Sequence, residues 1–181
     1  MEPTIEENLA KTLLLMERAA ALDAELIFFP EVQLSPFFAA KRGEDASGWL
    51  VTAEGPEITA IRDKARELGL CVSPNVYLLE NGKPYDASVM IGGDGEIMGV
   101  SKMVHIPQAE NFWEQDYYTP SGTGFRVYDL PGGRVGIVIC FDRHIPDGVR
   151  SCVRQGAELV IIPTANLTTE NMGLFEMEIR G

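Results

Sequence analysis

Short apolar segments alternate with amphipathic segments of helical periodicity, and this alternation constrains the fold more than any other feature of the chain. Leu26–Pro30 (LIFFP), Arg134–Cys140 and Leu159–Pro163 have the continuous apolar character of buried strands. Thr4–Asp23 instead repeats its apolar residues at the spacing of one helical face. A chain that mixes both patterns is expected to form a sheet covered by helices, which is an α/β fold.

The remaining elements follow from turn and helix signals. Asn81-Gly82 is a strong hairpin signal between two strands. Pro56 near a first turn and Gly69 as a terminator bound another helix. The pattern therefore predicts helices at Pro56–Leu68, Ile145–Gln155 and Gly173–Arg180, strands at Cys71–Leu79, Tyr85–Ile91, Ile97–Lys102 and Phe125–Leu130, and long loops at 32–53 and 105–124.

Composition limits the classes of partner. With 181 residues and 45% hydrophobic residues, the chain has enough core for one domain. The net charge of −12 argues against binding to nucleic acid or to an anionic membrane surface. The sequence contains no membrane-spanning apolar stretch, no leader peptide pattern and no CxxC pair among its three cysteines. We therefore expect a cytoplasmic protein that acts on a small molecule and needs no zinc.

Cys140 is the candidate nucleophile. It ends an apolar strand just before a predicted helix, where the helix dipole is expected to favour the thiolate. The alternative is a buried, unreactive cysteine, which is the interpretation we adopt for Cys71 and Cys152. The polar residues that directly follow Cys140, Asp142-Arg143-His144, weaken that alternative.

Glu31 and Lys102 also follow apolar strands. Partial burial would raise the pKa of the Glu31 carboxyl and make it a usable base. A fixed ammonium at Lys102 could stabilise an oxyanion. Each alone is better explained as an ordinary solvated side chain. The prediction rests on three strands, each of which delivers one member of a Cys/Glu/Lys set to its carboxyl end.

Three segments, FPE at Glu31, SKMVHIP at Lys102 and ICFDRHIP at Cys140, resemble the signature segments of the nitrilase superfamily of carbon–nitrogen hydrolases. The resemblance extends over essentially the whole chain. It implies a four-layer αββα sandwich, no metal or organic cofactor, and a homodimer or higher homo-oligomer when the protein is full length.

The resemblance also implies roles for individual residues. Cys140 would attack an amide-type carbon, and Glu31 would take the thiol proton, pass it to ammonia and then activate water. Lys102 and the backbone N–H of Phe141 would stabilise the oxyanion. The second glutamate of the family matches Glu114 best, with Glu110 as its competitor, and for either of them a solvated loop carboxylate is the alternative.

The segment CFDRHIP resembles that of N-carbamoyl-amino-acid amidohydrolases, which release ammonia and CO2. Arg143 matches an arginine that holds the substrate carboxylate, and a guanidinium suits that task because it can donate two parallel hydrogen bonds. Asn166 and His144 are further candidate contacts. A surface ion pair is the alternative for Arg143, and a turn residue is the alternative for Asn166.

Other functions remain open. A nitrilase or aliphatic amidase of the same superfamily is the nearest alternative, and a non-catalytic binding protein that retains the fold is the alternative from another class. Residues 1–181 are expected to form a single, partial carbon–nitrogen hydrolase domain, because no strand precedes the first helix and the chain stops within a helical pattern.

Overall fold

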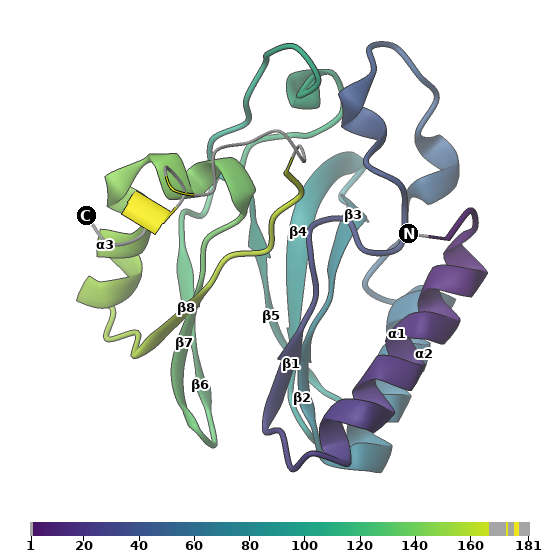
Figure 1. The fold of residues 1–181 in the computed structure, drawn as a ribbon, viewed down its shortest axis with the longest axis vertical. Coiled ribbons are helices and arrows are strands. Elements are labelled where there is room, and N and C mark those ends of the chain that lie inside the picture. Colours follow the sequence, from purple (N-terminus) through teal and green to yellow (C-terminus); the bar gives the residue numbers. More distant parts are fainter. Residues whose placement is uncertain (1, 167–172, 174–175, 178–181) are drawn as a thin grey trace.

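The computed structural model describes residues 2–166, 173, 176 and 177. Two β-sheets lie face to face, and helices cover their outer faces (Figure 1). The helices are α1 (Ile5–Ala20), α2 (Pro56–Leu68) and α3 (Pro146–Arg154). Short 3-10 turns, labelled η1 (Phe38–Ala40), η2 (Ser47–Trp49), η3 (Glu114–Asp116) and η4 (Cys140–His144), interrupt the loops.

The first sheet contains β1 (Leu26–Phe28), β2 (Cys71–Ser73), β3 (Asn75–Glu80), β4 (Lys83–Ile91) and β5 (Ile97–Lys102). Strands β1 and β2 are parallel, whereas β2, β3 and β5 pair antiparallel with β4. The predicted strand Cys71–Leu79 is divided into β2 and β3 by Pro74, which has no N–H for the ladder. The carbonyl of Pro74 still accepts from the Val89 N–H at 2.9 Å, so the register continues across the break.

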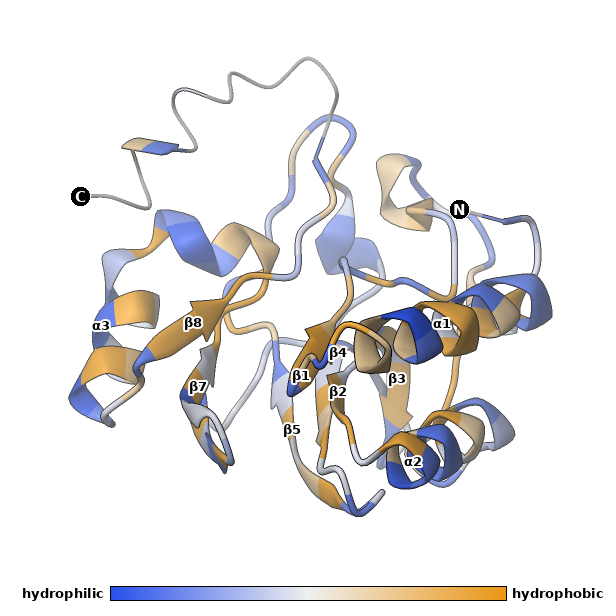
Figure 2. Ribbon diagram, turned by 60° about the horizontal axis from the view of Figure 1, so that its bottom comes forward, coloured by the Kyte–Doolittle hydropathy of each residue, from blue (hydrophilic) through white to orange (hydrophobic). Residues whose placement is uncertain are grey.

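Helices α1 and α2 cover the outer face of this sheet. Their apolar sides pack on alternate residues of the strands, and Figure 2 shows both helices divided between hydrophilic and hydrophobic residues. The fully buried members of this core include Met16, Ile58, Ile61, Leu78, Ala87 and Val89. The Thr4 hydroxyl caps α1, and Gly69 ends α2 in the left-handed conformation with a φ of 63°.

The second sheet has the order β6-β7-β8, with β6 at Arg126–Leu130, β7 at Gly133–Ile137 and β8 at Leu159–Ile161. Strands β6 and β7 form a hairpin, and β8 is parallel to β7. Helix α3 packs closely on β7, because a Cβ at Gly136 would lie 2.7 Å from the Cβ of Cys152. Only glycine fits this contact without a shift of the helix.

The inner faces of the two sheets form a second core. Met90 lies on β4 of the first sheet, and Met103 directly follows β5. Both pack with Ile137 and Ile161 of the second sheet. The hydroxyls of Ser101 and Tyr128 lie 3.0 Å apart across the interface. This layering confirms the predicted α/β sandwich.

Most predicted elements are confirmed to within a few residues. The strand predicted over Arg134–Cys140 ends at Ile137, and Cys140 instead begins η4. The helix predicted over Gly173–Arg180 falls largely outside the described residues. Within the described ranges, no helix is both long and apolar enough to cross a bilayer.

The packing of α2 gives a stability prediction. Ile61 has no exposed surface and lies in the core beneath α1 and α2. We expect Ile61→Ala to lower the free energy of unfolding by about 2–5 kcal/mol and Ile61→Val by about 0.5–1.5 kcal/mol, because the alanine leaves the larger cavity. Urea denaturation monitored by circular dichroism measures both. Equal losses for the two variants would contradict this packing.

Candidate active site

The segments that follow β1, β7 and β8 meet at one end of the two sheets. Cys140 is 4% exposed, and its thiol donates to the carbonyl of Ala165 with a sulfur–oxygen distance of 3.9 Å. The backbone N–H of Ala165 donates to Glu31 Oε2 at 2.7 Å. Ala165 thus connects the candidate nucleophile to the candidate base.

Both reactive residues lie in or beside strained backbone. Cys140 has a φ of 41°, and Val32, directly after Glu31, has a φ of 43°. Left-handed backbone is costly for a β-branched residue such as valine, so the surrounding contacts must enforce it. The Asn75 side chain accepts from the Val32 N–H at 2.7 Å, and the Cys140 N–H donates to the Pro163 carbonyl at 2.9 Å. These bonds fix the direction in which each side chain leaves its strand.

The structure does not bring Lys102 to Cys140. The β4–β5 register places Lys102 opposite Ala87, whose side chain belongs to the core beneath α1 and α2. The Lys102 ammonium pairs with Glu80 and lies 4.2 Å from the ring centroid of Tyr85. The next residue, Met103, occupies the inner core beside Cys140 instead. The predicted role of Lys102 as oxyanion stabiliser therefore lacks the geometry it requires.

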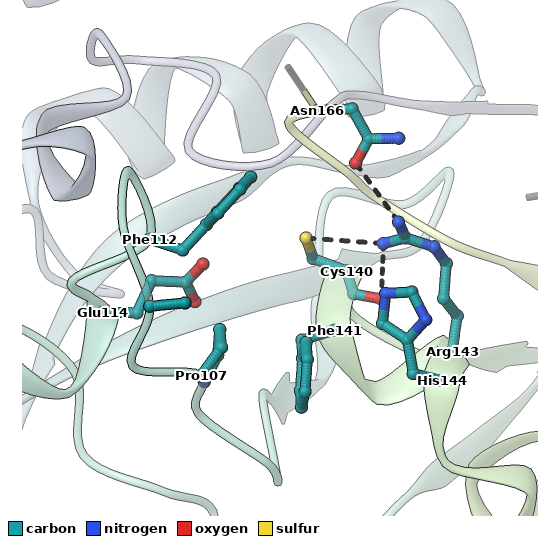
Figure 3. Close-up of a pocket in the computed structure, with 9 residues that line it drawn as sticks. Pro107, Phe112, Glu114, Cys140, Phe141, Arg143, His144 and Asn166 are labelled. Carbon is teal, nitrogen blue, oxygen red and sulfur yellow. Dashed lines mark hydrogen bonds between the residues drawn. The ribbon is translucent and has the colours of Figure 1, made fainter. Parts of the chain in front are cut away.

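A cavity of about 150 Å³ opens above Cys140. Figure 3 shows Glu114 on one side of it, Arg143 and His144 on the other, and the Cys140 sulfur between them. Glu114 is completely buried, and neither carboxyl oxygen has a hydrogen-bond partner among the described residues. Its competitor Glu110 is exposed and does not line the cavity, so the geometry favours Glu114.

Arg143 lies directly against the thiol. Its Nη1 donates to the Cys140 carbonyl at 3.1 Å and contacts the sulfur at 3.8 Å, and its Nη2 donates to Asn166 at 3.4 Å. The rings of Phe141 and His144 line the same wall, with centroids 5.1 Å apart. All four predicted substrate-binding residues thus line one cavity.

Asp142 anchors the loop that follows β5. Its carboxylate accepts from the backbone N–H groups of Val104 at 3.0 Å and His105 at 2.8 Å. The Nδ1 atom of His105 lies 2.7 Å from the same carboxylate. The Asp142 carboxylate therefore holds the loop after β5 in place, a role that the sequence pattern did not reveal.

The electrostatics of the site correct one prediction. Burial, followed by the nearby carboxyls of Glu31 and Glu114, raises the pKa of the Cys140 thiol well above its usual value of 9.0. Burial and these acidic neighbours therefore oppose the expected stabilisation of the thiolate. Burial, with the charges of Asp86 and Glu114, likewise raises the pKa of Glu31 well above 4.5.

Asp86 is a site residue that the sequence analysis missed. It is completely buried on the inner face of β4, and its two carboxyl oxygens have no hydrogen-bond donor. The pKa of Asp86 rises to about 6, mainly because of burial. An acidic residue inside an otherwise apolar, alternating strand (YDASVMI) was the available signal.

The titration of Glu114 predicts a pH-dependent stability. Burial and the charges of Asp86 and Asp142 raise its pKa from 4.5 to about 8. The folded state therefore binds more protons than the unfolded state between these values, and the free energy of unfolding falls as the pH rises through this range. Glu114→Gln removes this titration, so we expect a flatter pH profile and a more stable variant at pH 8.

Urea denaturation at several pH values measures this difference, on a scale of about 1.4 kcal/mol for each unit of pKa shift. Glu110→Gln is the matched control, because Glu110 lies in the same loop but is exposed. Parallel profiles for the wild-type protein and Glu114→Gln would contradict the assignment.

This chain is similar to known proteins over most of its length. A citrullinase of Francisella tularensis is 31% identical over 88% of this chain and 56% of its own length. An N-carbamoylputrescine amidase of Arabidopsis thaliana is 30% identical over 89% of this chain and 54% of its own length. The chain therefore spans about half the length of these two relatives.

Among solved structures, a carbon–nitrogen hydrolase from Helicobacter pylori G27 matches with a TM-score of 0.83 and 21% identity, over 98% of this chain and 64% of its own. An amidase from Nesterenkonia sp. AN1 matches with a TM-score of 0.79 and 21% identity, over 93% of this chain and 65% of its own. The family described as carbon-nitrogen hydrolase matches residues 1–178. This chain belongs to the carbon–nitrogen hydrolase family.

Proposed function

We propose that the protein is a cysteine-dependent hydrolase of non-peptide carbon–nitrogen bonds that acts on an N-carbamoyl amino acid. The observation that carries the proposal is the placement of the Cys140 sulfur in a small cavity between Glu114 and Arg143. A carboxyl group on one side suits the –NH2 of a ureido group. A guanidinium on the other side suits a substrate carboxylate.

The proposed reaction has two stages. Cys140 attacks the carbamoyl carbon while Glu31 takes the thiol proton, and the same proton leaves on ammonia when the carbon–nitrogen bond breaks. Water activated by Glu31 then cleaves the thioester-type intermediate, and the resulting carbamate releases CO2 and the amino acid. The backbone N–H of Phe141 remains the proposed donor to the oxyanion.

The names of the relatives support a ureido substrate without defining it. Citrulline carries a ureido group together with an α-carboxylate and an α-ammonium, whereas N-carbamoylputrescine carries a ureido group and an ammonium but no carboxylate. A nitrilase of Pyrococcus abyssi, 29% identical, is also similar to this chain. Because Arg143 lines the cavity, we favour the carboxylate-bearing substrates over the cationic one.

Ammonia release tests the proposal directly. The full-length protein is offered N-carbamoyl-β-alanine, citrulline, N-carbamoylputrescine, a short amide and a nitrile at equal concentration. We expect the carboxylate-bearing ureido compounds to be hydrolysed fastest and Cys140→Ala to be inactive. Equal ammonia release by the wild-type protein and Cys140→Ala would end the proposal. Faster hydrolysis of the nitrile or of the short amide would instead identify the protein as a nitrilase or an aliphatic amidase.

The position of Lys102 gives a further prediction. Its ammonium pairs with Glu80 on the outer side of the sheet, so Lys102→Met should leave the turnover number within a few-fold of the wild-type value. Removal of a true oxyanion donor costs about 10²–10³ in the turnover number. Steady-state kinetics on the best substrate distinguish the two, and a loss of that size in a folded Lys102→Met variant would contradict the structure.

Two observations favour a second candidate, a non-catalytic binding protein that retains the fold. Burial raises the pKa of the Cys140 thiol, and Lys102 pairs with Glu80 and does not line the cavity. A protein of this kind would bind a ureido acid but release no ammonia. Calorimetric titration of the wild-type protein, run beside the ammonia assay, identifies it.

A further inference from the structure

The carboxyls of Glu31 and Asp86 occupy one buried region between the sheets. Both residues are completely buried, and their side chains lie within hydrogen-bonding reach of each other. One oxygen of Glu31 and both oxygens of Asp86 receive no hydrogen bond from a donor in the described part of the chain. Three buried acceptor atoms without donors are unusual, because such atoms normally carry a large desolvation cost.

The groups that surround Asp86 come from several elements. The charged or titratable groups that interact with Asp86 lie in the segment after β1, in η3 and the residues after it, and in η4. Asn75, which also interacts with Asp86, lies on the paired strand β3. The titratable members are Glu31, Tyr77, Glu114, Tyr118, Cys140 and Asp142. None of these groups is a cation, and Lys102 on the adjacent strand belongs to the opposite face.

Two ionised carboxylates cannot donate to each other, but one protonated carboxyl can donate to a carboxylate. We propose that Asp86 is a positioning residue that shares one proton with Glu31, so that the pair, rather than Glu31 alone, is the base that faces Cys140. A single shared proton supplies the missing donor and leaves one negative charge in the cluster. In the described part of the chain, these acidic residues do not form a group that could hold a metal ion.

The pair has a defined proton balance. In the resting state it holds one proton and one negative charge, and Cys140 is a thiol. When Cys140 attacks, Glu31 passes its own proton to the Asp86 carboxylate and takes the thiol proton. The pair becomes doubly protonated and neutral, and the sulfur forms its new bond to carbon. The use of this pair in catalysis rests on the proposed hydrolase function, whereas the shared proton can be measured without any substrate.

Carboxyl carbon NMR on the unmodified chain is the first test. With ¹³C labels in the Asp and Glu side chains, we expect the Glu31 carboxyl to be protonated at pH 7 while Asp86 is ionised. Loss of a resonance in Glu31→Gln and in Asp86→Asn assigns each signal. If both carboxyls are ionised at pH 7, or if both are protonated, no proton is shared and the proposal is overturned.

Asp86→Asn is the second test. Removal of the neighbouring charge and of the acceptor for the Glu31 proton should lower the midpoint of Glu31 titration by about 1–3 pH units. A purely structural role for Asp86 predicts no such shift. An unchanged midpoint in the folded variant therefore contradicts the proposal, whatever happens to activity.

Glu80→Gln is the matched control, because it removes a carboxylate from the neighbouring strand on the face where Lys102 lies. We expect the Glu31 midpoint to remain unchanged in this variant. Cys152 is completely buried on the side of α3 that packs on β7, so its resistance to iodoacetamide shows that each variant remains folded. If the hydrolase proposal is wrong but the shared proton exists, the protein will release no ammonia while the NMR result stays as expected.

Discussion

The structure of this site depends on one constraint, the removal of three carboxyl groups and a thiol from water at the end of the sheet sandwich. Glu31, Asp86 and Glu114 are each completely buried, and the Lys102 ammonium pairs with Glu80 on the other face of the sheet. Ionisation of every group would be prohibitive in such a region. Protons must therefore remain on part of the cluster, and the distribution of those protons decides which group can act as a base.

The backbone conformation keeps these mutually repelling carboxyl groups and the thiol close together. Left-handed conformations at Val32 and Cys140 turn the chain sharply just where the reactive side chains must point inward. Ala165 lies between them and uses its N–H for Glu31 and its carbonyl for the thiol. The cost of the strained residues is offset by buried hydrogen bonds and by the two apolar cores, which is how strain persists at functional sites.

Three of the helices and most of the strands could be predicted from the sequence, because apolar periodicity records which segments are buried. Glu31, Glu114 and Cys140 lie close enough for their charges to influence one another. The same pattern failed for Lys102, since a strand end does not reveal which face its last side chain occupies. A shift of one residue along β5 exchanges the faces, and the inner position belongs to Met103. Asp86 was missed for a related reason, because the sequence analysis did not determine which face of the sheet each residue of this strand occupies.

The arrangement of charge in the cavity also bears on substrate choice. Arg143 is a cation in contact with Cys140, and it lies on the wall opposite Glu114. With its pKa near 8, Glu114 is largely a neutral carboxyl at pH 7 and can both donate to and accept from an uncharged amide. An ammonium placed beside Arg143 would meet repulsion, whereas a carboxylate would be held in a fixed orientation. For the proposed ureido acid, this polarity would place the neutral end toward Glu114 and the carboxylate toward Arg143.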